Sequence, residues 1–162
     1  MAGSVSFSPI GLIRTPFTST AGMPIQAVVA RDVPGRIELD PDLAPGLADL
    51  EGFSHLILVY HLHLASPPRL AVTPFLDEVP HGIFATRSPA RPNPIGISTV
   101  RLAGIYGTTL DLLDVDMVDG TPLLDIKPYV PAFDDRDGAR IGWFEGVLDR
   151  LEGATADDRF RT

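Results

Sequence analysis

Short apolar runs separated by glycine and proline dominate the pattern of hydrophobic and polar positions along the chain. Runs of this length, rich in β-branched and aromatic residues and bounded by turn residues, are typical of β-strands. The nearly continuous apolar run Phe53–Leu64 predicts a strand buried on both faces, although a buried helix fits its periodicity nearly as well. The predicted strands are Ser4–Arg14, Ile25–Ala30, Arg36–Leu39, Phe53–Leu64, Ile83–Thr86, Ile97–Ile105 and Leu110–Met117.

The last predicted strand contains an irregularity. Apolar residues alternate from Leu110, but the alternation shifts by one residue at Leu113 and then continues to Met117. Because side chains on a strand repeat every two residues, a one-residue shift predicts a β-bulge near Leu112–Leu113.

Helical signals are few. Asp40 followed by Pro41 is typical of a helix start, with the aspartate as N-cap and the proline at the first helical position. Pro45 and Gly46 should keep this helix short. A second helix is predicted near the C-terminus, followed by a polar tail, Gly153–Thr162, that we expect to fray. The apolar residues at helical spacing are Leu43, Leu47 and Leu50 in the first helix and Trp143, Val147, Leu148 and Leu151 in the second.

Many short strands and few helices predict a mainly β protein, a small antiparallel β-barrel with a few short helices. The 16 prolines and 15 glycines fall between the apolar runs, in agreement with stiff turns joining short elements. A length of 162 residues fits one domain. Residues 1–135 are predicted to form the barrel core, and residues 136–162 a C-terminal helix and tail packed on the same domain.

Composition narrows the chemistry. The chain has no cysteine, which excludes disulfides, thiolate nucleophiles and cysteine-bound zinc. The N-terminus does not have the pattern of a signal peptide, and no apolar run approaches the roughly 20 residues of a membrane span. We therefore expect a soluble, cytoplasmic protein without a membrane partner. A net charge of −8 argues against binding nucleic acid over the whole surface.

The charge is unevenly distributed. No Asp or Glu occurs in Val79–Leu110, although 21 acids in 162 residues would place about four there, and the segment contains Arg87, Arg91 and Arg101. This pattern indicates either a local anion site or a buried segment that cannot hold carboxylates.

A proline-rich loop, Thr86–Gly96, lies inside this acid-free segment. Pro89, Pro92 and Pro94 fix the backbone, so the loop is rigid without bonding to itself. Such a loop can hold the side chains of Arg87, Arg91 and Asn93 in set directions for binding a phosphate or carboxylate. The alternative is a stiff connector whose arginines pair with surface acids.

A second polar segment begins at an Asp119-Gly120 turn, and Asp119 could accept hydrogen bonds from ribose hydroxyls or face a cation. Asp125, Lys127 and Tyr129 alternate, so an extended backbone would put them on one face. Lys127 is the only lysine beside twelve arginines, a weak sign of a specific role. A simple turn with an Asp–Lys surface pair explains the segment equally well.

Other site types find little support. His61 and His63 would share one face of a strand, as in metal-binding cupin barrels, but no glutamate follows at the expected spacing, so no metal is predicted. His63 is better explained as a pocket or core residue. The nucleotide-binding glycine motif, the phosphate-binding loop and the nucleophile elbow of hydrolases are all missing.

The polar segments together resemble one family. The motifs are Gly11-Leu12-Ile13-Arg14-Thr15-Pro16-Phe17, Gly52-Phe53-Ser54-His55-Leu56, Phe84-Ala85-Thr86-Arg87-Ser88, Arg91-Pro92-Asn93-Pro94-Ile95-Gly96, Asp119-Gly120-Thr121-Pro122 and Asp125-Ile126-Lys127-Pro128-Tyr129. In this order they are similar to the TsaA-like family, which includes the tRNA threonylcarbamoyladenosine N6-methyltransferase. The resemblance runs from about Ser6 to Pro131; longer bacterial members carry a further C-terminal domain.

The resemblance implies a β-barrel methyltransferase, a homodimer with S-adenosylmethionine bound near the subunit interface, and tRNA as substrate. Arg91 and Asn93 would bind the substrate, and Asp125, Lys127 and Tyr129 would be catalytic, with Asp125 the candidate proton acceptor. The cofactor contacts implied by position are Pro24, Ile25, Gln26, His63, Leu64, Arg87, Ile97, Met117, Val118, Asp119 and Gly120.

Three other functions are compatible with the sequence. A non-catalytic module that binds S-adenosylmethionine or a nucleotide would have the same cofactor residues. A methyltransferase acting on another RNA or on a small adenine-containing molecule is also compatible with the acidic charge. A metal-dependent barrel ranks last.

Overall fold

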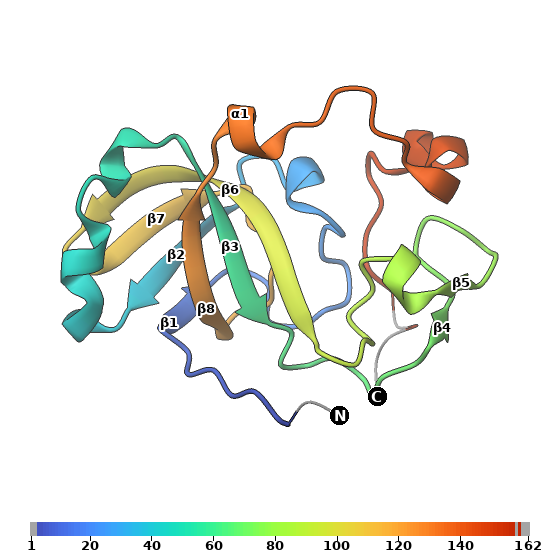
Figure 1. Ribbon diagram of the computed structural model, residues 1–162, viewed down its shortest axis with the longest axis horizontal. Helices are drawn as coiled ribbons and strands as arrows, with labels where there is room; N and C mark the ends of the chain where they lie inside the picture. The colour runs from blue at the N-terminus through green and yellow to red at the C-terminus, as the bar shows by residue number, and fades with distance from the viewer. Residues whose placement is uncertain (1–2, 158, 160–162) are drawn as a thin grey trace.

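Six antiparallel strands form a closed barrel in the computed structural model, which describes residues 3–157 and 159. Around the barrel the order is β1-β2-β7-β6-β3-β8, and β8 pairs with β1 to close it (Figure 1). The prediction of a small antiparallel barrel is confirmed. The strands are β1 (Gly11–Arg14), β2 (Pro34–Leu39), β3 (His55–His61), β6 (Ile95–Tyr106), β7 (Thr109–Leu113) and β8 (Thr121–Pro128).

The core fills the barrel interior with side chains from alternate positions of each strand. In β3, Leu56, Leu58 and Tyr60 are buried, whereas Ile57 and Val59 between them are half-buried. The prediction that this strand is buried on both faces is therefore wrong, because one face of a closed barrel points outward. Burying a leucine or isoleucine side chain contributes about 1.5–3 kcal/mol. The fully buried large side chains are Ile13, Ile37, Leu56, Leu58, Ile83, Leu110, Leu112, Leu123, Val100 and Val115.

One contact in the barrel requires a glycine. Gly96 in β6 pairs directly with Tyr60 in β3, and the tyrosine ring lies close against it. A Cβ atom on Gly96 would lie 2.2 Å from Cε2 of that ring. Glycine allows the ring to turn inward against the strand, where its hydroxyl can reach Ser98.

The predicted bulge is in the wrong strand. The register shifts in β6, between Leu102 and Gly104, where β6 faces β7. In β7 itself the strand ends at Leu113, and Asp114 follows with φ of 69°. This left-handed residue, rather than a bulge, moves Val115 and Met117 back onto the buried side.

Several predicted strands are shorter or of another type. Of Ser4–Arg14, only Gly11–Arg14 forms a strand. Ile25–Ala30 contains a 3-10 turn, η1 (Ala27–Val29), because no neighbouring strand pairs with it and its bonds close locally. Ile83–Thr86 contains η4 (Ile83–Ala85), where both the N–H and the hydroxyl of Thr86 donate to the carbonyl of Ile83. Such local side-chain bonds compete with strand pairing.

The first helix begins where the sequence predicts. The carboxylate of Asp40 accepts from the N–H of Asp42 at 3.1 Å, and Pro41 is the first residue of η2 (Pro41–Leu47). This helix is of the 3-10 type and is followed by η3 (Leu50–Gly52). Pro45 inside it cannot donate a backbone bond, which disfavours a regular α-helix.

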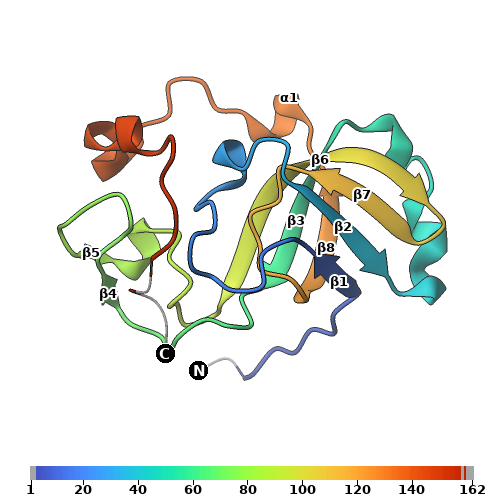
Figure 2. The same cartoon turned by 180° about the vertical axis from the view of Figure 1, so that it is seen from behind.

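Two further pieces lie beside the barrel. A two-stranded sheet, β4 (Ala71–Val72) with β5 (His81–Gly82), stands next to the C-terminal turns in both views (Figures 1 and 2). After α1 (Pro131–Asp134), the predicted C-terminal helix is instead two 3-10 turns, η5 (Gly142–Gly146) and η6 (Leu148–Arg150). They are separated at Val147, whose ψ of 0° interrupts helical geometry.

The C-terminal tail is docked, at least up to residue 157. Thr155 forms an antiparallel bridge with Pro24, and Ala156 exchanges backbone bonds of 2.8 Å with Gly22 and Met23. The prediction of fraying is wrong for this part; residues 158 and 160–162 lie outside the described residues. No helix among the residues described has the length and apolar character to cross a membrane.

Candidate functional site

A cavity of about 620 Å³ lies where the barrel meets the β4–β5 segment and the C-terminal turns. Its wall takes residues from five parts of the chain that are distant in sequence, within 20–28, 60–65, 74–76, 86–97 and 116–118 with Thr121, and the C-terminal segment 141–157 completes it. This volume is in the range of about 300–1,000 Å³ found for small-molecule sites. Most of its lining is apolar.

Arg87 and the segment after the first turn meet on this wall. Pro24, Ile25 and Gln26 line the cavity, and the guanidinium of Arg87 donates to Oε1 of Gln26 at 3.1 Å. Gln26 is neutral, so this contact orients Arg87 without neutralising its charge. Within residues 3–157 and 159, Arg87 forms no ion pair, and its positive charge is available to an anionic ligand group.

His63 and Leu64 form the wall beyond the end of β3. The Nδ1 atom of His63 is buried and has no hydrogen-bond partner among the described residues. Burial lowers the pKa of His63, and His61 adds to this effect, so the ring is neutral at neutral pH. A neutral imidazole with an unused buried nitrogen can bind a polar ligand atom.

Ile97 from β6 and Met117 and Val118 from the β7–β8 connection also line the cavity. Met117 and Val118 are buried, whereas Ile97 is 55% exposed and lies at the rim. These apolar side chains suit a flat, weakly polar ligand group.

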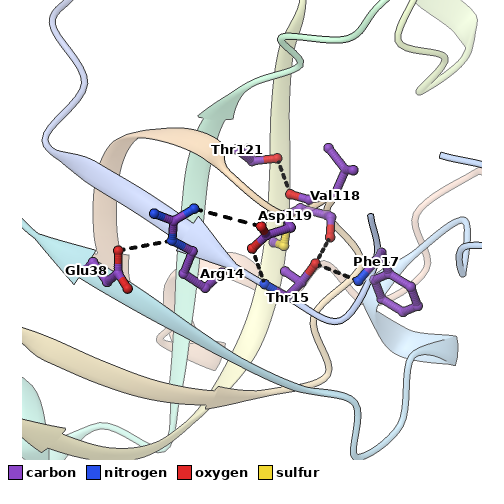
Figure 3. A network of polar contacts seen from close by, with 8 residues as sticks. Arg14, Thr15, Phe17, Glu38, Val118, Asp119 and Thr121 are labelled. Carbon is purple, nitrogen blue, oxygen red and sulfur yellow. Dashed lines mark hydrogen bonds and ion pairs between the residues drawn. The ribbon is translucent and has the colours of Figure 1, made fainter. Parts of the chain in front are cut away.

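Asp119 and Gly120 do not reach the cavity wall. The carboxylate of Asp119 accepts from the N–H of Thr15 at 3.1 Å and lies 3.8 Å from the guanidinium of Arg14 (Figure 3). The Thr15 hydroxyl in turn donates to the carbonyl of Met117 at 2.8 Å. Asp119 therefore holds the connection that carries Met117 and Val118, and the structure does not place it where the resemblance implies a direct ligand contact.

Sequence reasoning gave no role to Asp116, Ser98 or Tyr60. Asp116 lines the cavity, and its Oδ1 accepts from the hydroxyl of Ser98 at 2.6 Å. Ser98 is also 2.8 Å from the hydroxyl of Tyr60. Burial raises the pKa of Asp116 to about 6, while the bond from Ser98 opposes this rise. Burial is the main cause that raises the pKa of Tyr60, and the nearby carboxylate of Asp116 adds to it, so the phenol stays protonated.

The proline-rich loop uses one of its arginines internally. Arg91 lines the cavity, but its Nη1 donates to the carbonyls of Thr86 at 3.0 Å and Ser88 at 3.1 Å. Asn93 is exposed outside the cavity wall. Arg101 lies elsewhere on the barrel, between Asp114 and Asp32. Of the charged residues in the acid-free segment, Arg87 alone combines a cavity position with an unpaired charge among the described residues.

The residues predicted to be catalytic are not part of the cavity wall; Asp125 and Lys127 lie in β8, and Tyr129 follows its last residue. Asp125 pairs with Lys127 at 2.7 Å, and the hydroxyl of Tyr129 donates to Asp135 at 2.6 Å. Asp125 is therefore not placed to accept a proton from a ligand in the cavity of its own chain. It does lie near the rim, because Val59 has Asp125 on one side and the rim residue Ile97 on the other.

Comparison with known proteins identifies the family. The family model of the tRNA-methyltransferase O N-terminal domain matches residues 12–135. This chain belongs to that family. A tRNA (adenine(37)-N6)-methyltransferase of Escherichia coli is 36% identical over 143 residues, which cover 79% of this chain and 59% of that protein. The resemblance to the TsaA-like family inferred from the motifs is confirmed, and the matching model is that of tRNA-methyltransferase O (TrmO).

Relatives of the TrmO family differ in length. A probable S-adenosyl-L-methionine-binding protein of Pyrococcus abyssi is 53% identical over 96% of this chain and 85% of its own. The crystal structure of TrmO from Pseudomonas aeruginosa superposes with a TM-score of 0.74 at 40% identity, covering 87% of this chain and 63% of that one. The chain thus spans less than two thirds of the bacterial TrmO proteins that it matches.

The C-terminal segment lies beyond the TrmO family match but still forms part of the cavity. Trp143 and Phe144 line it, stacked on each other with ring centroids 3.9 Å apart. Trp143 also stacks on His81 with ring centroids 4.3 Å apart, and His81 pairs with Asp77 at 2.9 Å. The segment is thereby attached to the β4–β5 region, and sequence reasoning did not predict this wall.

Proposed function

We propose that this chain binds S-adenosylmethionine in the 620 Å³ cavity and transfers its methyl group to N6 of an adenosine in tRNA, with threonylcarbamoyladenosine as the acceptor. The main support for this proposal is one observation about the cavity wall. Nine of the eleven residues that the family resemblance implies for the cofactor lie on the wall of this single cavity. The name of the Escherichia coli relative supports the position of the methyl group.

The wall residues fit the cofactor chemically. The unneutralised guanidinium of Arg87 suits the carboxylate of the methionine part. Apolar side chains of Ile25, Met117 and Val118 suit the adenine ring, and the free Nδ1 of His63 suits a polar edge. The bound cofactor supplies an electrophilic methyl group on sulfur. The protein holds the acceptor nitrogen in line with that methyl group, and such positioning can contribute about 7–11 kcal/mol.

We also propose a homodimer that covers the outer face of β3, β6 and β8. Ile95 and Ile97 are 46% and 55% exposed there, next to half-buried Ile57 and Val59. Because this face borders the cavity rim, the interface would lie beside the bound cofactor, as the family resemblance implies. As a tRNA-modifying enzyme the dimer would work in the cytoplasm.

Cofactor binding and methyl transfer test the proposal together. Calorimetry with S-adenosylmethionine should show one site per chain, and Arg87→Ala should weaken binding about 10- to 150-fold, the value of a lost charge-assisted hydrogen bond. Arg36→Ala is the matched control, because Arg36 pairs with Asp111 on the barrel surface away from the cavity. Unchanged binding by Arg87→Ala would refute the cofactor site.

Transfer of a labelled methyl group to total tRNA tests the reaction itself. Labelled N6-methylated threonylcarbamoyladenosine in the digested tRNA supports the full proposal. Tight cofactor binding without transfer to any RNA would favour the non-catalytic binding module instead.

A further inference from the structure

Asp116 stands out among the carboxylates of the cavity wall. The other one, Asp157, is 2.8 Å from the guanidinium of Arg159. Asp116 forms no ion pair within residues 3–157 and 159; its side chain contact is the hydroxyl of Ser98. Asp116 is a half-buried carboxylate in a mostly apolar wall, and the charge of Arg87 favours its ionised form without forming an ion pair with it. A carboxylate in such surroundings indicates a role beyond packing.

We infer that Asp116 accepts the proton that leaves N6 of the acceptor adenosine during methyl transfer. This inference rests on the proposed function and assigns the proton to a different residue from Asp125, which is not part of the cavity wall.

The surroundings of Asp116 hold its carboxylate in a fixed direction. Ser98 sits in the middle of β6 and is itself held by the hydroxyl of Tyr60 from β3, so two paired strands position the hydrogen bond to Oδ1. The N–H of Ala27 supplies a further stabilising contact. A group fixed by the barrel in this way can receive a proton without reorganising first.

The chemistry balances with Asp116 as the acceptor. The lone pair of N6 is delocalised into the purine, so the nitrogen attacks well only as its proton leaves. As the bond from N6 to the methyl carbon forms, the bond from that carbon to sulfur breaks and its electron pair stays on sulfur. The N6 proton passes to the carboxylate of Asp116, which later releases it to water. No other reactant is needed.

The electrostatics of the wall suit this role. Burial raises the pKa of Asp116 to about 6, and the bond from Ser98, the N–H of Ala27 and the charge of Arg87 limit the rise. Tyr60 stays neutral beside it because burial raises its own pKa. Asp116 is therefore mostly ionised at neutral pH and still basic enough to take a proton, as general base catalysis requires.

Asp116→Asn is the direct test, with Asp111→Asn as matched control on the outer surface beside Arg36. We expect Asp116→Asn to lower the single-turnover rate of methyl transfer to tRNA at least about 100-fold. Its affinity for S-adenosylmethionine should stay within threefold of wild type. Transfer within tenfold of wild type would overturn the inference, and so would a loss of cofactor affinity as large as the loss of rate, because Asp116 would then be a binding residue.

A pH profile separates a chemical from a structural role. The wild-type rate should rise with pH as Asp116 ionises, and Ser98→Ala should move this rise to higher pH because the bond from Ser98 favours the charged form. An unshifted profile would overturn the inference even if Asp116→Asn fails to fold. If wild type transfers no methyl group, the proposed function fails and the inference with it; active wild type with an active Asp116→Asn refutes the inference alone.

Discussion

Replacing Gly96 with alanine tests the contact between β6 and β3 on which the inner wall of the cavity depends. The added Cβ would lie 2.2 Å from Cε2, 2.5 Å from Cζ and 2.8 Å from Cδ2 of Tyr60. These atoms belong to a buried ring between two paired strands, so neither the ring nor the backbone can move away freely. We expect Gly96→Ala to destabilise the fold by overpacking.

The magnitude follows from two opposing effects. Overpacking of a filled core costs typically about 1–3 kcal/mol. Replacing a strand glycine by alanine otherwise stabilises by about 0.4–1 kcal/mol, through the unfolded chain. Gly104 in the same strand isolates the second effect, because the atoms nearest to its added Cβ, at 3.0–3.2 Å, belong to the ring of Tyr106, which is 69% exposed and can turn away. The stability difference between the two variants is therefore the overpacking cost.

Thermal unfolding followed by circular dichroism measures this difference. For a domain of this size about 1 kcal/mol corresponds to 2–4 °C, so Gly96→Ala should melt about 2–12 °C below Gly104→Ala. Equal melting temperatures, or a more stable Gly96→Ala, would refute the close approach of the ring. In the expected case methyl transfer should fall as well, because a displaced Tyr60 no longer holds Ser98.

Two further predictions concern Trp143 in the C-terminal segment and the neighbouring Asp77–His81 pair. Trp143 is the only tryptophan and lines the cavity, so its emission should change as S-adenosylmethionine binds; an unchanged spectrum at a calorimetrically saturating concentration would remove this segment from the site. The bond to His81 lowers the pKa of Asp77, so the pair stabilises the fold above the ordinary aspartate pKa of about 3.9, and this contribution is lost as pH falls through the lower folded value. In urea titrations between pH 5 and 2, the stability gap between wild type and Asp77→Asn should close with falling pH; a constant gap would contradict the pairing.

The barrel strands could be predicted as apolar runs bounded by turn residues, but their two faces could not. In β3 every second side chain enters the core although the strand is apolar throughout, and in β6 Ser98 is buried whereas Ile97 is exposed. The segments at Ile25–Ala30 and Ile83–Thr86 are equally apolar, yet they fold as 3-10 turns. Ile25 and Val28 line the cavity, and Ile83 packs in a small second core with Val72 and Ala90. Local composition does not reveal whether a partner strand exists.

The sequence could predict site residues whose position depends on their own loop, but not those whose position depends on distant segments. The family resemblance named Arg87, Met117 and Val118, and all three line the cavity. The sequence did not indicate Asp116, because an aspartate after a strand usually faces water. Its burial results from contacts with segments far away in sequence. The role of Asp119 was equally hidden, since its partner, the N–H of Thr15, is more than 100 residues away.

Closure of the barrel has a consequence for how the chain folds. Where β1 pairs with β8, Gly11 lies opposite Leu123 and Ile13 opposite Thr121. The second edge of the first strand can therefore form its hydrogen bonds only after the last strand is present. Bringing such distant segments together slows folding, because the entropy of a long loop is lost before the contacts form. During synthesis, β1 will therefore stay paired on one edge only until residues 121–123 have left the ribosome.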